Sequence, residues 1–500
     1  MEPRAQWPGR SSQSAEDDAV APSGVSPLVP GPNSADTPQL DQPQLVVVAN
    51  RLPLRRTVAR GVEHWERSPG GLVAGLAPVM AGRDCAWVGW TGDGNGSEPF
   101  VHDRIRFVPV EVTPSEVEEY YEGFSNRTLW PLYHDAIRTP EFQRSWWSTY
   151  VSVNQRFADV TAQTAAPGAL VWIHDYQLQL VPGLLRQMRP DLRIGFFLHI
   201  SFPPQELFMQ LPWRKEIMEG ILGADVVGFQ VPIAARNFSV LAKRLTSAQG
   251  RGSVLDFENR QVKVGAFPVS IDVGSLEAIA RSDETQLRAK EIREQMGSPE
   301  TLILGVDRLD YTKGIEARLT AYKEMLFDGT ISVPERVMVQ IAVPTRDSVP
   351  AYMEQRLAIE RLIGELNGDF GQMGSPAVHY LHRNLDITEL VALYCAADIL
   401  LVTPYRDGMN LVVKEYVACR TDSGAVVLSE FAGAAQSLTS AYLVNPHDVQ
   451  QLKEGILRAI VAPPGERRQR MRALRRSLLS WTAEDWATAY LSSLTSTETA

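Results

Sequence analysis

The chain has 500 residues, of which 44% are hydrophobic and 22% charged, and its formal net charge is −10 at pH 7. This composition is typical of a soluble globular protein with two or three domains, and the negative charge argues against a general nucleic-acid binder. Cys85, Cys395 and Cys419 show no CxxC spacing, and no apolar run approaches the roughly 20 residues that span a bilayer, so we expect a cytoplasmic protein without zinc, disulfides or membrane contact.

Residues 1–43 are rich in Pro, Ser, Ala, Gly and Asp and contain little aliphatic periodicity. Such a segment cannot bury enough apolar surface to offset the entropy lost on ordering, so we predict a disordered extension. A passive tail and a regulatory or assembly segment are both compatible with this composition.

Short apolar runs alternate with helical patterns through the first half of the chain, as in parallel sheets covered by helices. The predicted strands are 44–49, 87–90, 107–110, 169–173, 193–198, 225–230 and 261–268. Arg51, Asp175 and His199 each follow the carboxyl end of a predicted strand, the edge where open α/β sheets bind ligands. The alternatives are a solvated arginine and structurally satisfied polar groups.

Two further features of the first half are candidates for ligand contact. Gly70 and Gly71 form a glycine turn before a predicted helix, but without the GxGxxG spacing of a nicotinamide-binding site. Tyr121 and Trp130 belong to an aromatic-rich segment at 118–131. Aromatic faces pack on the apolar faces of sugar rings, although most such residues are core residues.

The second half repeats the alternation, with predicted strands at 301–306, 336–343, 378–381, 399–402, 425–428 and 441–444. Helical patterns cover 276–295, 388–397, 447–459 and an arginine-rich segment from 467 to 486. Arg308 and Lys313 flank one strand-to-helix turn, so both can point at a single anion. The alternative is a pair of solvated surface charges.

The stretch 403–415 joins the buried strand 399–402 to a helix. Gly408 lets the backbone approach a ligand, and the free N–H groups of the following helical turn form an anion site. Asp407 and Glu415 lie two turns apart, so both carboxylates can face one side of the helix start. This pattern suits a nucleotide-sugar, and an ordinary strand–turn–helix with a capping Asp is the alternative.

Three segments closely resemble trehalose-6-phosphate synthases, which are retaining glycosyltransferases of the GT-B fold: 406–415, 308–314 and 431–435. The resemblance extends from about Leu45 to about Trp486. It implies an α/β protein with two Rossmann-like domains facing a central cleft. We therefore predict an extension at 1–43, an acceptor domain at 44–268, a donor domain at 269–465, and a C-terminal helical segment at 466–490 that crosses back to the first domain.

The resemblance also implies roles for individual residues. The implied donor-binding residues are Gly70, Gly71, Arg308, Lys313, Leu385, Asp407, Gly408, Met409, Asn410, Leu411 and Glu415. The implied glucose 6-phosphate residues are Arg51, Tyr121, Trp130, Asp175 and Arg346. Arg308, Lys313, His199 and Asp407 are the implied catalytic residues. Where the family pattern has Phe this chain has Leu385, which offers a smaller stacking surface to the donor base.

The reaction implied by the resemblance transfers glucose from a nucleoside-diphosphate-glucose to glucose 6-phosphate, with retention, giving α,α-trehalose 6-phosphate. It requires no metal or other cofactor, and we expect a homodimer or homotetramer. The donor could be UDP-, ADP- or GDP-glucose. Two alternatives stay open: another GT-B transferase, such as a sucrose-phosphate or glycogen synthase relative, and a non-catalytic sugar-phosphate sensor on the same fold.

Overall fold

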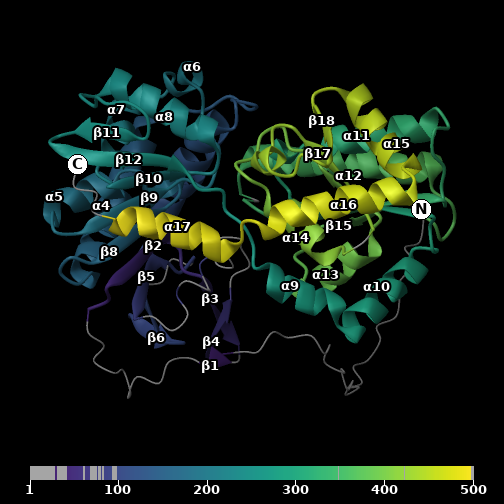
Figure 1. Cartoon of the computed structure of the whole chain (residues 1–500), viewed down its shortest axis with the longest axis horizontal. Helices are drawn as coiled ribbons and strands as arrows, with labels where there is room; N and C mark the ends of the chain where they lie inside the picture. Colours follow the sequence, from purple (N-terminus) through teal and green to yellow (C-terminus); the bar gives the residue numbers. More distant parts are fainter. Residues whose placement is uncertain are drawn as a thin grey trace, which may run out of the picture.

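The structure is a computed structural model that describes residues 29–30, 42–59, 62–67, 76, 80, 84–92, 98–346, 348–421 and 423–496, with 29–30, 55–59 and 62–67 described as backbone only. It has two α/β lobes that lie side by side (Figure 1). We call the lobe built on residues 45–266 the first lobe and the one built on 301–444 the second lobe. Each lobe has its own hydrophobic core.

The first lobe contains a nine-stranded sheet in the order β11-β12-β10-β9-β8-β2-β5-β7-β6. All neighbours are parallel except at the two edges, where β6 and β11 run antiparallel. Its strands are β2 (Leu45–Arg51), β5 (Cys85–Trp90), β6 (Phe100–His102), β7 (Ile105–Pro109), β8 (Leu170–His174), β9 (Arg193–Phe197), β10 (Val226–Phe229), β11 (Val254–Phe257) and β12 (Arg260–Ala266). The central strands are continuously apolar because helices cover both faces of the sheet.

The helical elements of the first lobe are α2 (Pro114–Glu116), the π-helix η1 (Val117–Leu129), α3 (Trp130–Tyr133), α4 (Arg144–Thr164), η2 (Tyr176–Leu178), α5 (Val181–Met188), α6 (Gln205–Phe208), α7 (Arg214–Ile221) and α8 (Pro232–Leu245). A small antiparallel sheet joins β1 (Val29–Pro30), β4 (Val62–Arg67) and β3 (Leu54–Ala59). Thus one pair of residues in the predicted extension is a strand, and residues 1–28 and 31–41 lie outside the described residues.

The second lobe contains a six-stranded parallel sheet in the order β15-β14-β13-β16-β17-β18. Its strands are β13 (Thr301–Arg308), β14 (Arg336–Val343), β15 (Val378–Leu381), β16 (Ile399–Val402), β17 (Ala425–Ser429) and β18 (Tyr442–Val444). Numbered along the chain, this is the doubly wound order 3-2-1-4-5-6. The order reverses between β13 and β16, so the loops after these two strands diverge and leave room for a ligand.

The helical elements that follow the first lobe are α9 (Val273–Arg281), α10 (Asp283–Gln295), η3 (Tyr311–Lys313), α11 (Ile315–Phe327), α12 (Pro350–Phe370), α13 (Ile387–Ala396), α14 (Leu411–Cys419), η4 (Gly433–Gln436), α15 (Val449–Val461), α16 (Pro464–Leu479) and α17 (Ala483–Thr495). The predicted segment 276–295 is therefore two helices. Its break falls at Ser282, whose extended backbone lets the side chain accept a hydrogen bond from the N–H of Thr285.

The predicted C-terminal segment also divides into two helices, because Thr482 caps α17 with a capping box. In Figure 1, α16 lies on the second lobe and α17 crosses the first. Tyr490 of α17 donates to the carbonyls of Phe196 and Val226, and its ring stacks on Trp172 with centroids 4.6 Å apart. The predicted return of the chain to the first domain is confirmed.

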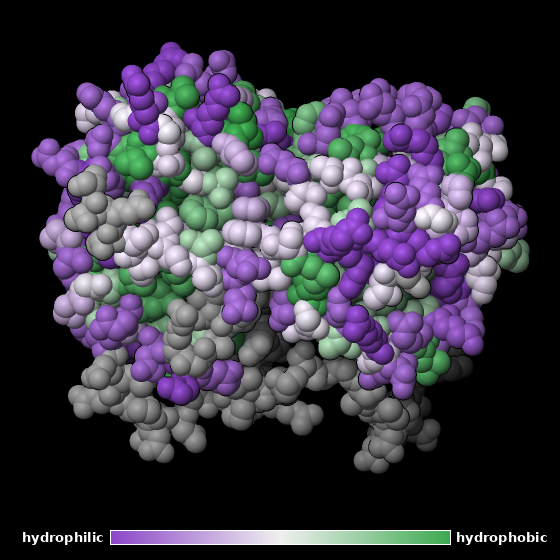
Figure 2. All heavy atoms as spheres, viewed as in Figure 1, coloured by the Kyte–Doolittle hydropathy of each residue, from purple (hydrophilic) through white to green (hydrophobic). Residues whose placement is uncertain are grey.

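Arginines on the outer side of α16 face solvent. Arg468, Arg472 and Arg476 are exposed, and hydrophilic side chains gather over this helix in Figure 2. None of the helices in the described segments is both long and apolar enough to cross a membrane. The predicted domain limits stay a prediction, and the strands of the two large sheets fall on either side of residue 268.

Candidate functional site

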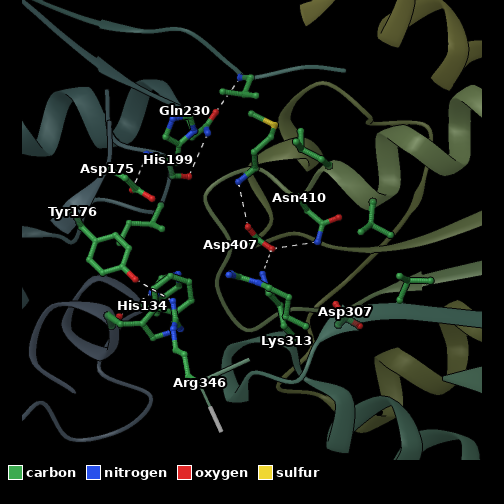
Figure 3. A pocket seen from close by; sticks show the side chains of 18 of the residues that line it. His134, Asp175, Tyr176, His199, Gln230, Asp307, Lys313, Arg346, Asp407 and Asn410 are labelled. Atoms are coloured by element: carbon green, nitrogen blue, oxygen red, sulfur yellow. Dashed lines mark hydrogen bonds and ion pairs between the residues drawn. The ribbon is translucent and has the colours of Figure 1, made fainter. Parts of the chain in front are cut away.

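A cavity of about 430 Å³ lies between the two lobes, at the carboxyl ends of their parallel strands (Figure 3). Residues from both lobes form its walls: Tyr121, Trp130, His134, Asp175, Tyr176, Gln177, His199, Ile200, Gln230, Val269, Val306, Asp307, Arg308, Lys313, Arg346, Asp407, Met409, Asn410, Leu411, Val412 and Glu415. A second cavity, of about 640 Å³, shares Tyr121 and Arg346 with the first and also contacts Arg51 and Trp90. Both sizes suit a ligand of sugar-nucleotide or sugar-phosphate dimensions.

On the second-lobe side, the turn after β13 carries two cations. Arg308 ends the strand and is exposed, while Lys313 lies in η3 and is only 8% exposed. Gly314, with φ of 63°, makes the turn into α11, and a Cβ at this position would lie 2.2 Å from the carbonyl oxygen of Thr403. A larger residue there would push apart the two loops that flank the switch point.

Lys313 pairs with Asp407 of the loop after β16, with Nζ 2.6 Å from Oδ2. The same carboxylate accepts from the Asn410 amide at 3.2 Å and from the N–H of Met409 at 3.3 Å (Figure 3). Burial opposes ionisation of Asp407, but the charge and hydrogen bond of Lys313 outweigh it, so the pKa of Asp407 lies below its ordinary value. The carboxylate of Asp407 is therefore ionised at neutral pH.

The turn at Asp407 and Gly408 precedes the helix α14, as the sequence pattern predicts. Asn410, with φ of 77°, caps it by accepting from the N–H of Val413, and Leu411 is its first residue. Asp407 thus lies in the loop and not on the helix, yet it reaches the same cavity as Glu415. Glu415 accepts from the hydroxyl of Tyr394 at 2.8 Å, and burial raises its pKa.

A buried guanidinium lies beneath this turn and joins its parts. Arg318, which is 0% exposed, donates to the carboxylate of Asp307 at 2.7 Å, to the hydroxyl of Thr403 at 3.0 Å and to the carbonyl of Lys313 at 2.9 Å. It therefore ties β13, the loop after β16 and η3 together.

On the first-lobe side, three cations surround Tyr121. Burial opposes ionisation of its phenol, but the charges of Arg346, Arg51 and Arg308 outweigh this effect and lower its pKa. The guanidinium of Arg51 lies 5.4 Å from the Tyr121 ring centroid and 4.5 Å from that of Trp90. This convergence of positive charge favours an anion.

Arg346 of the second lobe reaches into the first. Its side chain is 4% exposed, its guanidinium lies 3.8 Å from the Trp130 ring centroid, and it donates to the hydroxyl of Tyr176 at 3.0 Å. Within its own lobe it pairs with the buried Asp310 at 3.2 Å and donates to the hydroxyl of Tyr352. One side chain thus connects the two walls of the cavity.

His199 and Asp175 line the first-lobe wall, and the buried His174 contacts His199. The Nε2 atom of His199 lies 3.0 Å from Nδ1 of His174, and burial lowers the pKa of His199 to about 3, so its ring is neutral. Asp175 accepts from the N–H of His199 at 3.2 Å, and burial raises the pKa of Asp175 to about 6.

Backbone strain accumulates at this site. Asp175, Arg346 and Asn410 have φ values of 76°, 52° and 77°, in the region that L-residues rarely adopt. Each such conformation costs on the order of 1–3 kcal/mol and persists only when its surroundings impose it. All three line the first cavity.

The structure brings most of the predicted residues together. Lining the first cavity are Tyr121, Trp130, Asp175, His199, Arg308, Lys313, Arg346, Asp407, Met409, Asn410, Leu411 and Glu415. Arg51 lines the second cavity, and Leu385 lines neither but packs against the second-lobe core. Gly408 lies where the lobes meet, since a Cβ there would be 2.4 Å from the carbonyl oxygen of His199. Gly70 and Gly71 lie outside the described residues.

Sequence reasoning missed His134, Gln230 and Asp307, which also line the first cavity. Asp307 and Gln230 lie at the carboxyl ends of β13 and β10, so the sheet-edge argument applied to Arg308 would have found them. For His134 the sequence offers only one weak indication, which is that it lies one helical turn after the predicted site residue Trp130. Its ring lies 4.2 Å from the Trp130 ring, and burial lowers its pKa to about 4.

Within the part of the chain that the structure describes, no group of three His, Cys, Asp or Glu side chains could hold a metal ion. The predicted absence of a metal requirement stays a prediction. The guanidinium of Arg308 and the ammonium of Lys313 could stabilise a negatively charged leaving group at this site.

Comparisons with known proteins agree with this geometry. The family model of glycosyltransferase family 20 matches residues 43–496. A trehalose-6-phosphate synthase of Mycolicibacterium gilvum is 52% identical over 484 residues, which cover 93% of this chain and 96% of that protein.

Solved structures with bound ligands are also similar. A trehalose-phosphate synthase of Burkholderia xenovorans in complex with glucose 6-phosphate has a TM-score of 0.84 and 30% identity, covering 90% of this chain and 100% of that one. A structure from E. coli bound with UDP-2-fluoro glucose has a TM-score of 0.83 and 31% identity, covering 90% and 98%. These matches confirm the predicted α/β GT-B fold, the predicted resemblance to trehalose-6-phosphate synthases and a glycosyltransferase activity. The chain therefore belongs to glycosyltransferase family 20.

Proposed function

We propose that the protein transfers glucose from a nucleoside-diphosphate-glucose to glucose 6-phosphate, with retention of configuration, giving α,α-trehalose 6-phosphate. The observation that carries this proposal is the pair of positively charged regions on the two sides of one interlobe site. One is the Lys313 and Arg308 turn, and the other is the group of arginines around Tyr121. Two anionic substrates could bind there with their sugars facing each other.

The donor diphosphate would bind Arg308, Lys313 and the first N–H groups of α14. Lys313 would then exchange its carboxylate partner for the diphosphate, which frees Asp407 to accept from hydroxyls of the donor glucose. The neutral His199 contacts the same sugar, and Glu415 accepts from the ribose. Once bound in this way, the two cations stabilise the leaving diphosphate, so we propose that no metal is needed.

The acceptor phosphate would bind Arg346 and Arg51 beside Tyr121. The sugar ring would pack on Trp130, with Asp175 accepting from its hydroxyls. We propose reaction on one face, in which the departing phosphate helps to deprotonate the acceptor hydroxyl. We also propose a cytoplasmic homo-oligomer, a dimer or tetramer, acting on these small molecules alone.

The test measures nucleoside-diphosphate release from UDP-, ADP- and GDP-glucose, with and without glucose 6-phosphate and with EDTA. The product is identified by mass and anomeric configuration. Acceptor-dependent release of an α,α-linked disaccharide phosphate supports the proposal and identifies the donor base. Equal activity with fructose 6-phosphate or glucan would support another GT-B transferase. Tight binding of both ligands without release would support a sensor.

Loss of activity in Arg308→Ala and Lys313→Ala links turnover to the proposed residues. Removal of one charge-assisted hydrogen bond costs about 1.5–3 kcal/mol, which is roughly tenfold to a hundredfold in rate. Lys323→Met is the matched control, because Lys323 pairs with Glu365 on the surface, away from both cavities. Unchanged turnover in a folded Arg308→Ala or Lys313→Ala protein would contradict the assigned roles.

A further inference from the structure

A continuous series of hydrogen bonds crosses from the second lobe to the first through the segment that links them. The Lys414 ammonium in α14 donates to the carbonyl of Val269 at 2.5 Å. The N–H of Val269 donates to Oε1 of Gln230 at 2.9 Å, and Nε2 of Gln230 donates to the carbonyl of His199 at 3.2 Å (Figure 3). We call Lys414, Val269 and Gln230 the linker relay.

The members of the linker relay are removed from solvent. Lys414 and Gln230 are each 4% exposed and Val269 is 3% exposed. Within the described part of the chain, the Val269 carbonyl is the one hydrogen-bond acceptor recorded for the Lys414 ammonium. A buried polar group that loses its partner cannot recover the lost hydrogen bond from water, so movement of one member requires movement of the next.

One end of the linker relay lies at the proposed donor site, and the other holds His199, whose N–H is bonded to the proposed acceptor residue Asp175. Lys414 precedes Glu415 and belongs to α14, the helix whose first turn faces the cavity. At the other end, the His199 carbonyl lies where the backbone at Gly408 approaches the first lobe. The N–H of the same residue is held by Asp175. The peptide groups of His199 are thus fixed between Asp175 and Gln230.

We propose that Gln230 and Lys414 are positioning residues that couple occupation of the donor site to occupation of the acceptor site. When a nucleoside diphosphate pulls α14 toward the cavity, Lys414 carries the linker with it. Gln230 then carries the His199 carbonyl and, through the His199 N–H, the carboxylate of Asp175. Because coupling free energy is reciprocal, each ligand tightens the binding of the other. This inference rests on the proposed function for the identity of the two ligands.

The test is isothermal titration of glucose 6-phosphate in the presence and absence of saturating nucleoside diphosphate, using the base that the transfer assay identifies. The ratio of the two dissociation constants is the coupling factor. We expect Gln230→Leu and Lys414→Met each to lower the coupling factor about tenfold, or to one if the wild-type factor is below about ten. A tenfold change corresponds to about 1.4 kcal/mol. Affinity for either ligand alone should change less.

Two further variants test the linker relay. Gln230→Glu keeps an acceptor for the Val269 N–H but places a buried carboxylate against the His199 carbonyl, so we expect it to lose coupling and to lower the unfolding midpoint. Gln372→Leu is the matched control, because Gln372 donates to the Val333 carbonyl away from both cavities. It should retain the wild-type coupling factor and turnover.

The double variant of Gln230→Leu and Lys414→Met should have the same coupling factor as either single variant, because the residues act through one hydrogen-bonded series. Additive losses, an unchanged factor in folded variants, or a wild-type factor of one would overturn the linker relay. If the wild-type protein couples the two ligands but transfers no glucose, the proposed function fails and the linker relay stands. If the protein transfers glucose but the variants keep the wild-type coupling factor, the linker relay fails and the proposed function stands.

Discussion

Asp407→Asn should destabilise the folded protein because it leaves the Lys313 ammonium without its partner. The two side chains are 11% and 13% exposed, so water cannot replace the lost interaction. Breaking a buried pair from one side typically costs about 3 kcal/mol or more in unfolding free energy. Lys313→Met should cost less, about 2 kcal/mol, because Asn410 and the Met409 N–H still donate to the Asp407 carboxylate.

The double variant should be no less stable than Asp407→Asn alone, because it buries no unpaired charge. Its activity should not recover, since the proposed diphosphate and sugar contacts are both gone. Urea unfolding at pH 7 measures the stability of the four proteins, and nucleoside-diphosphate release measures their turnover. Stability and activity are therefore expected to separate within one mutant cycle.

The matched control is Lys323→Met, which breaks the Lys323–Glu365 pair at 2.6 Å with side chains 29% and 46% exposed. Its expected cost is below about 1 kcal/mol, with unchanged turnover. Additive losses of stability in the Lys313 and Asp407 cycle would refute the coupling between these charges. Wild-type turnover in the folded double variant would refute their proposed place in the reaction.

Three more predictions follow from the geometry. Gly408→Ala should lower turnover at least about tenfold without unfolding either lobe, because the added Cβ would lie 2.4 Å from the His199 carbonyl oxygen. A wild-type turnover rate would show that the lobes need not approach so closely. The His134 pKa of about 4 lies below the unfolded value, so only the unfolded chain gains a proton there as pH falls through 6.5, and stability should drop by about 2 kcal/mol between pH 7 and 5. Urea unfolding of His134→Phe should show a pH dependence that is smaller by this amount. The same pH profile in His134→Phe and the wild type would contradict the prediction. Arg318→Met should lower the unfolding free energy by about 3–5 kcal/mol, because it leaves Asp307 buried and unpaired. Addition of Asp307→Asn should restore most of this stability in thermal unfolding, and no recovery would argue against the ion pair.

Much of the fold could be predicted from the sequence because buried parallel strands are continuous apolar runs. The predicted strands 336–343 and 399–402 match β14 and β16 at both ends. Helix boundaries were harder, because Ser282 interrupts the helical pattern with a single extended residue that the apolar periodicity does not reveal. The π-helical course of Val117–Leu129 also has no signal in spacing rules built on 3.6 residues per turn.

The candidate site was predictable where it depends on sheet topology. The carboxyl ends of parallel strands lie at one edge of a sheet, where α/β proteins bind ligands, so Arg308 and Asp175 could be placed from their positions at the ends of strands. Contacts between the lobes could not be predicted in this way, because they depend on how two separate cores pack together. The stacking of Arg346 on Trp130 and the close approach of Gly408 to His199 are both of this kind.

The final helix has a consequence for biosynthesis. A Cβ at Gly195 would lie 2.7 Å from the Tyr490 hydroxyl, and one at Gly228 would lie 2.6 Å from the Tyr490 ring. The Tyr490 hydroxyl also donates to the carbonyl of Val226, a residue 264 positions earlier in the chain. A ribosome adding about 5–20 residues per second needs roughly 15–50 s to cover that separation. During this interval the nascent first lobe exposes the apolar surface around Trp172 that Tyr490 and Trp486 later cover. The synthesis of α17 therefore completes the core of a lobe whose strands were made much earlier.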